Sequence, residues 1–89
     1  MIDPDICILK PSRLVVYCAA WCPDCKRSKA VLDNYKIEYL NVDLGKDNTA
    51  FMFIEKIGRR VRVPTLIFPD GTILIEPSDE TLKNKLGVA

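Results

Sequence analysis

Apolar and polar positions along the chain alternate with the two periods that distinguish strands from helices. Residues 13–19 form an almost continuous apolar run rich in β-branched and aromatic side chains, which is typical of a central strand covered on both faces. The alternation of a strand places Leu14, Val16 and Cys18 on one face and the intervening residues on the other. Residues 23–36 then bring apolar side chains together at helical spacing, which predicts a helix with one buried face.

The second strand and the second helix follow the same patterns. Residues 37–44 alternate as a strand, and Asp47 or Asn48 can cap a helix that runs to about Ile57. Gly58 comes next, and glycine readily takes the left-handed conformation that ends many helices. We therefore expect the chain to leave this helix at Gly58.

The remaining residues predict a hairpin and a last helix. Residues 63–68 form an apolar strand with a proline near its start, and an Asp-Gly turn at 70–71 joins it to residues 72–76. Ser78 or Asp79 can cap the last helix. The order strand, helix, strand, helix, hairpin and helix predicts an α/β fold, in which a four-stranded mixed sheet carries about three helices on its faces.

The length of the chain suits a single small domain preceded by a short arm. Of its 89 residues, we expect 1–12 to form the N-terminal arm and 13–89 to form the domain. Within the arm, residues 6–9 could form a short edge strand, although Pro4 and Pro11 bracket them.

Charge and composition narrow the class of protein. Thirteen basic and twelve acidic residues leave a net charge of +1, which points neither to a nucleic acid nor to a membrane surface as partner. The apolar runs are far shorter than a membrane-spanning helix requires. The first five residues carry two acids and no basic segment, unlike a secretory signal. We therefore expect a cytoplasmic protein, and a monomer.

The segment Cys22-Pro23-Asp24-Cys25 carries the strongest chemical signal, since it lies between a predicted strand and a predicted helix. Pro23 suits the first helical position, which places Cys22 at the N-cap and Cys25 one turn later, close enough for a disulfide. The positive end of the helix favours a thiolate at Cys22, which is the reactive form of cysteine. Redox chemistry is therefore the leading interpretation, and two structural cysteines or half of a zinc site are the alternatives.

Two further cysteines stand outside this segment. Cys7 is interpreted as a partly buried bystander, and Cys18 as a small core side chain, with a third redox thiol as the alternative. A four-ligand zinc site would have to recruit both at unusual spacing in a chain without histidine, so no metal site is predicted.

These motifs together resemble a known family. Trp21-Cys22-Pro23-Asp24-Cys25, followed by Val63-Pro64-Thr65 ahead of a hairpin, is similar to the thioredoxin superfamily and, within it, to the glutaredoxins. The similarity runs from about Arg13 to Leu86 and implies a thioredoxin-like fold.

The resemblance also implies roles for individual residues. The first cysteine of the family attacks, the second resolves, and a cis-proline lies opposite them; here these are Cys22, Cys25 and Pro64. The backbone of Val63 would pair with the backbone of a bound substrate or thiol. The residues that would bind substrate are Trp21, Pro23, Asp24, Val63, Pro64, Ser78 and Asp79.

Departures from the family concern the electron donor. Ala19 stands where glutathione-dependent members usually have lysine, and Ile75-Glu76 stand where they have two glycines. The segment from Val63 to Ser78 looks most like the mycoredoxin-type glutaredoxins, whose partner thiol is mycothiol. We therefore expect no bound cofactor and expect mycothiol or glutathione as co-substrate, or a flavin disulfide reductase as partner.

The expected function is that of a glutaredoxin-like enzyme, a dithiol–disulfide oxidoreductase that reduces protein or mixed disulfides through Cys22 and Cys25. Two alternatives remain open. One is an electron donor of the ribonucleotide-reductase type that is reduced by a thioredoxin reductase. The other is an iron–sulfur carrier, in which Cys22 of two chains and two small thiols hold the cluster.

Overall fold

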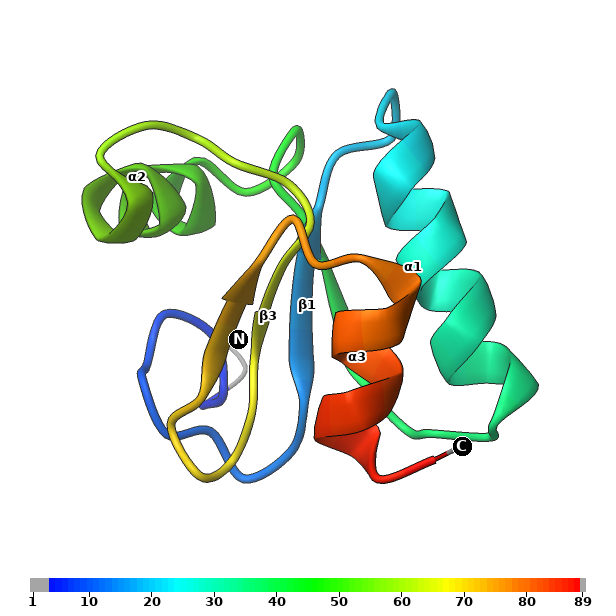
Figure 1. Cartoon of the computed structure of the whole chain (residues 1–89). Coiled ribbons are helices and arrows are strands. Elements are labelled where there is room, and N and C mark those ends of the chain that lie inside the picture. Colours follow the sequence, from blue (N-terminus) through cyan, green and yellow to red (C-terminus); the bar gives the residue numbers. More distant parts are fainter. Residues whose placement is uncertain (1–3, 89) are drawn as a thin grey trace.

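The computed structural model describes residues 4–88 and shows a four-stranded sheet with helices on both faces (Figure 1). The strands of the described chain are β1 (Val15–Cys18), β2 (Leu40–Asp43), β3 (Thr65–Ile67) and β4 (Ile73–Ile75). The helices of the same part are α1 (Pro23–Asn34), α2 (Asn48–Gly58) and α3 (Asp79–Leu86). The predicted mixed sheet with three helices is confirmed, although several strands are shorter than the patterns indicate. None of these helices is long and apolar enough to cross a membrane.

The strand order is β2-β1-β3-β4, so β1 lies inside the sheet with a partner on each side. It runs parallel to β2, with Val15 opposite Leu40, and antiparallel to β3, with Val16 opposite Leu66. A parallel pair needs a crossover connection, which α1 supplies between β1 and β2. The hairpin that joins β3 to β4 completes the sheet as predicted.

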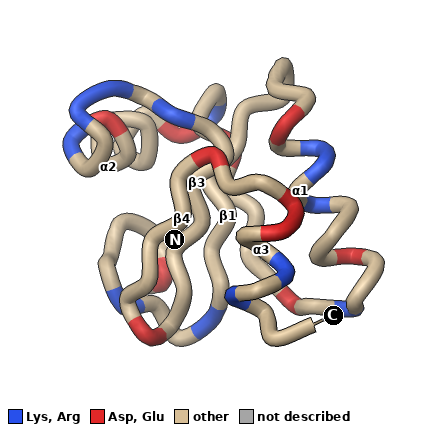
Figure 2. The backbone as a smooth tube through the Cα atoms, viewed as in Figure 1, with Lys and Arg blue, Asp and Glu red and all other residues tan. Residues whose placement is uncertain are grey.

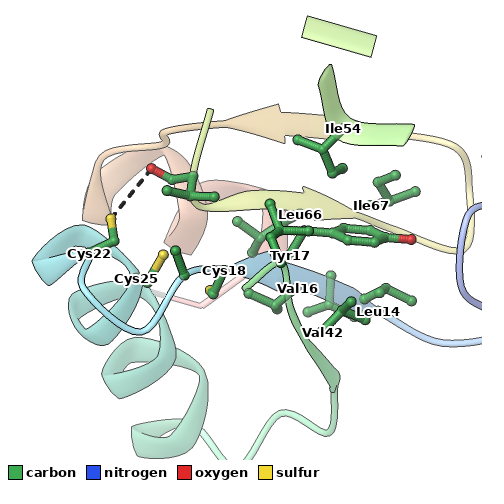
Figure 3. Packing of buried hydrophobic residues seen from close by; sticks show 14 of the residues in the cluster. Leu14, Val16, Tyr17, Cys18, Cys22, Cys25, Val42, Ile54, Leu66 and Ile67 are labelled. Atoms are coloured by element: carbon green, nitrogen blue, oxygen red, sulfur yellow. Dashed lines mark hydrogen bonds between the residues drawn. The ribbon is translucent and has the colours of Figure 1, made fainter. Parts of the chain in front are cut away.

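Helices cover both faces of β1. Helices α1 and α3 pack together on one face, and α2 lies on the other (Figure 1). The Tyr17 ring contacts the Phe53 ring of α2 with centroids 5.8 Å apart, and Leu66 and Ile67 of β3 are fully buried beside it (Figure 3). Every residue of β1 is buried, which explains why its sequence is apolar at both odd and even positions.

Helix α2 ends one residue later than predicted. Asp47 is its N-cap and accepts a hydrogen bond from the Ala50 N–H, but Gly58 is still helical, and Arg59 takes the left-handed conformation with φ of 64°. The Arg62 side chain packs over Gly58, with its Cδ 3.6 Å from the place where a Cβ would stand. This is an ordinary van der Waals distance, so Arg62 would tolerate a side chain at Gly58. The expectation that Gly58 ends the helix is wrong.

This helix end makes Arg59→Gly a stabilising change. A non-glycine residue in the left-handed region costs about 1–2 kcal/mol. Glycine loses about 0.5–1 kcal/mol more conformational entropy on folding, so the free energy of unfolding should rise by about 0.5–1 kcal/mol. Denaturant unfolding measures it. Arg60→Gly is the matched control, because Arg60 does not have a positive φ and should lose stability. Equal losses in the two variants would contradict the prediction.

The described part of the N-terminal arm, residues 4–12, is held against the domain by side-chain hydrogen bonds. The Asp5 carboxylate accepts bonds from the Ser12 N–H at 2.7 Å, from the Ser12 hydroxyl and from Arg13 Nε at 3.1 Å. The Cys7 N–H donates to the Tyr17 hydroxyl at 2.9 Å. Residues 4–7 form a turn, and Cys7 has a φ of 65°, which a strand does not allow. The possible edge strand at residues 6–9 is therefore absent.

The Asp5 contacts predict a pH dependence of stability. The hydrogen bond from the Ser12 N–H is the main cause that lowers the pKa of Asp5 below its ordinary value of 3.8. A lowered pKa contributes stability above that value, and the contribution is lost as the pH falls through the folded-state pKa. Asp5→Asn should therefore lower the Tm at pH 7 and flatten its decline below about pH 4. Thermal melts across this range test it, with Glu38→Gln, at an exposed carboxylate, as control. A wild-type decline that persists in Asp5→Asn would refute this role.

Candidate active site

Cys22 is the N-cap of α1, as the sequence predicts. Its backbone is extended, with φ of −92° and ψ of 114°, and Pro23 begins the helix. The Cys22 N–H donates to the Ala19 carbonyl at 3.1 Å, which fixes the turn between β1 and the helix. No side chain caps the first turn, so its free N–H groups and the positive end of the helix dipole lie at the Cys22 sulfur.

The Cys22 thiol points at the loop before β3. It donates a hydrogen bond to the Val63 carbonyl over a sulfur–oxygen distance of 3.7 Å (Figure 3). The next peptide bond, Val63–Pro64, is cis, as the resemblance implies. Two segments that are far apart in the sequence thus meet at one sulfur, and Cys22 is 6% exposed there.

Cys25 lies one turn into α1 and is 1% exposed. Burial raises the pKa of its thiol, and hydrogen bonds with the thiols of Cys18 and Cys22 raise that pKa further. All three thiols are free, so the structure corresponds to the reduced protein. Cys25 is therefore held as a protonated thiol between two other sulfurs.

Residues next to the two cysteines in the sequence form the exposed surface around these thiols. Trp21 is 77% exposed, and Pro23 and Asp24 are also exposed. Val63 and Pro64 are buried. Trp21, Pro23 and Asp24 thus have exposed side chains. The Val63 side chain is buried, so only its backbone is available for binding.

Arg27 joins the two parts of the predicted binding surface, a role that the sequence did not reveal. Its Nη1 lies 3.1 Å from an Asp24 oxygen and its Nε lies 3.0 Å from an Asp79 oxygen. Ser78 is the N-cap of α3, where its hydroxyl accepts from the Thr81 N–H at 3.1 Å. The spacing of Asp24 and Arg27 is a recognisable helical pair. The contact with Asp79 has no local signal.

Two further features concern the loop after α2 and the residue after β4. The loop carries the exposed Arg59 and Arg60, visible as the long blue stretch beside α2 in Figure 2. Glu76 takes a left-handed conformation with φ of 50°, and its N–H donates to the Pro64 carbonyl at 2.8 Å. Among residues 4–88, no three His, Cys, Asp or Glu side chains are grouped as a metal site would require.

Solved structures share this fold. The solved thioredoxin-like protein BC3987 is 25% identical with a TM-score of 0.72, over 81% of this chain and 97% of its own. The solved glutaredoxin of Archaeoglobus fulgidus has a TM-score of 0.72 at 19% identity, over 83% of this chain and 85% of its own, which shows the fold alone. The predicted thioredoxin-like fold is confirmed.

The sequence comparisons identify the family. A Mycobacterium tuberculosis protein (strain H37Rv) named "Putative glutaredoxin Rv3198A" is 36% identical over 74 residues, which make up 82% of this chain and 88% of that protein. The glutaredoxin family model matches residues 14–73, from the start of the first strand to the start of the last. The chain belongs to the glutaredoxin family.

Proposed function

We propose that this member of the glutaredoxin family is a dithiol–disulfide oxidoreductase that reduces protein or mixed disulfides through Cys22 and Cys25. The position of the Cys22 sulfur carries this proposal. It stands at the uncapped start of α1, where the helix dipole stabilises a thiolate, and it lies beside the exposed Trp21.

The reaction consists of two thiol–disulfide exchanges. In the first, the Cys22 thiolate attacks one sulfur of the substrate disulfide, and the other substrate sulfur leaves as a thiolate that takes up a proton. In the second, Cys25 attacks the Cys22 sulfur, the mixed disulfide breaks, and the Cys22–Cys25 disulfide forms. The proton of Cys25 passes to the departing substrate thiolate. The raised pKa of Cys25 keeps it protonated until a substrate is attached.

The Val63 carbonyl changes partner during this reaction. In the reduced protein it accepts the hydrogen bond of the Cys22 thiol. When Cys22 loses its proton, this carbonyl becomes free to accept a backbone N–H of the substrate. Trp21, Pro23 and Asp24 then offer the side-chain contacts, and Ser78 and Asp79 contribute the polar end of the surface.

The electrons come from outside the chain. We propose mycothiol or glutathione as the donor, or a flavin disulfide reductase, with no cofactor bound to the chain. The mycobacterial relative and the likeness to mycoredoxin-type glutaredoxins favour mycothiol. We also propose that the protein is cytoplasmic, because the cytoplasm keeps thiols reduced and can therefore regenerate the dithiol. We propose further that it is a monomer.

A stoichiometric experiment tests the proposed function. The reduced protein is mixed with a peptide that contains one disulfide, and the masses of both products are measured by mass spectrometry. One equivalent of protein should lose two hydrogen atoms while one equivalent of peptide gains them. A peptide that stays oxidised in excess reduced protein would refute the function.

A further inference from the structure

Cys18 lies beside the thiol that acts second in the proposed reaction. It is the last residue of β1, it is 2% exposed, and the proposed reaction does not use it. A buried cysteine can serve simply as a small core side chain. Figure 3, however, shows its side chain beside the Cys25 thiol, and the two thiols interact closely enough to shift each other's pKa.

The three sulfurs lie in a defined order. Figure 3 shows them in the succession Cys22, Cys25 and Cys18, running from the start of α1 to the end of β1. Cys25 is drawn between the other two, and interactions with both of them raise the pKa of its thiol. A thiol that displaces Cys22 from Cys25 must reach the Cys25 sulfur, and Cys18 is the side chain drawn next to it at the end of β1.

We propose that Cys18 is a second disulfide partner of Cys25, so that the oxidised protein exchanges between a Cys22–Cys25 and a Cys18–Cys25 disulfide. The Cys18 thiolate attacks the Cys25 sulfur, the Cys18–Cys25 bond forms, and the Cys22–Cys25 bond breaks. The bonding electron pair leaves with Cys22 as a thiolate, and the proton that Cys18 released passes to the solvent. The step needs no external oxidant or reductant. It rests on the proposed function only for the first disulfide.

The exchange returns the attacking thiol to the surface of the oxidised protein. With the disulfide stored between β1 and α1, Cys22 is again free at the helix start. The protein can then hold an internal disulfide and a mixed disulfide with a small thiol at the same time. In the reverse exchange, Cys22 attacks the Cys25 sulfur, so the Cys22–Cys25 disulfide forms again and Cys18 becomes a free thiol.

The burial of Cys18 sets the rate of this exchange. Burial raises the pKa of the Cys18 thiol, so little of the attacking thiolate is present at neutral pH. The rate of the exchange should therefore increase as the pH rises. Thiol–disulfide rearrangements in general take seconds to hours.

Double labelling of the wild-type protein tests the proposal. The protein is oxidised, incubated at about pH 7 or pH 9 and then unfolded in acid, where exchange stops because thiolates are absent. One alkylating reagent marks the free thiols, and after reduction a second marks the others. Cleavage after Arg13 and Lys26 leaves Cys18, Cys22 and Cys25 on one peptide and Cys7 on another. The first reagent should mark Cys22 in part of the molecules, and sooner at the higher pH. A first label found on Cys18 alone in all samples would overturn the proposal.

A variant without the attacking cysteine gives an independent result. Cys22→Ser oxidised with diamide should yield peptide 14–26 two hydrogen atoms lighter. Adding Cys7→Ser should leave this product, and adding Cys18→Ala should remove it. This variant cannot reduce disulfides under the proposed function, so its internal disulfide is measured separately from that activity. If Cys22→Ser keeps both thiols of peptide 14–26 free after diamide treatment, or joins Cys25 to Cys7 instead, the pairing would be wrong.

Discussion

Cys22→Ser is expected to abolish disulfide reduction completely, whereas Cys25→Ser is expected to stop the reaction at a mixed disulfide on Cys22. The helix dipole acts at the N-cap sulfur, whereas Cys25 is buried and its pKa is raised. Mass spectrometry of each reduced variant mixed with a peptide disulfide distinguishes them. Cys25→Ser should gain the mass of one peptide thiol, and Cys22→Ser should gain nothing.

Cys7→Ser is the control for these variants, because its thiol lies in the arm and not beside α1. It should reduce the peptide at the wild-type rate. If brief alkylation of the reduced protein at mildly acidic pH labels Cys25 before Cys22, the assignment of attacking and resolving thiols would be wrong.

Glutathione is expected to serve this protein at least about tenfold less well than a typical glutaredoxin, and less well than mycothiol. Ala19 lacks the cation of the usual lysine, and a charge-assisted contact to a carboxylate contributes roughly 1.5–3 kcal/mol. About 1.4 kcal/mol corresponds to one decade in affinity. Glu76 adds a second loss, since it keeps a left-handed backbone but places a side chain where the family has glycine.

The rates at which glutathione and mycothiol reduce a mixed disulfide on Cys25→Ser give this comparison directly. A thioredoxin reductase is tested separately on the oxidised wild type, since it acts on the Cys22–Cys25 disulfide. Glu76→Gly is the matched variant, and it should raise the glutathione rate by opening the backbone. If glutathione clearly exceeds mycothiol, Arg59, Arg60 or Arg62 must supply the missing contact.

The architecture and the place of Cys22 at the start of α1 could be predicted because their signals are local. The apolar run of β1, the Pro23 start of α1 and the cysteine spacing each depend on neighbours in the sequence. The cis bond before Pro64 was available only through the family resemblance, since no local pattern distinguishes it from an ordinary X–Pro bond.

The features that could not be predicted depend on distant contacts. Arg27 appears as a solvated cation on a helix until α3 brings Asp79 to it, 52 residues further along the chain. Gly58 fits a helix end by every local rule, but the helix continues through it and the left-handed residue is Arg59. The Asp5 contacts with Ser12 likewise replace the strand that an apolar segment of the arm suggested.

The inner position of β1 bears on how the protein moves while it works. Its amides are bonded to neighbouring strands on both sides, and its side chains are buried on both faces. Such amides exchange with solvent mainly when the whole domain unfolds, whereas loop amides exchange through small local openings. The strand that leads directly to Cys22 is therefore expected, together with β3, to open most slowly. Turnover then requires motion of side chains and of the Val63 loop, while the backbone that positions the sulfur stays fixed.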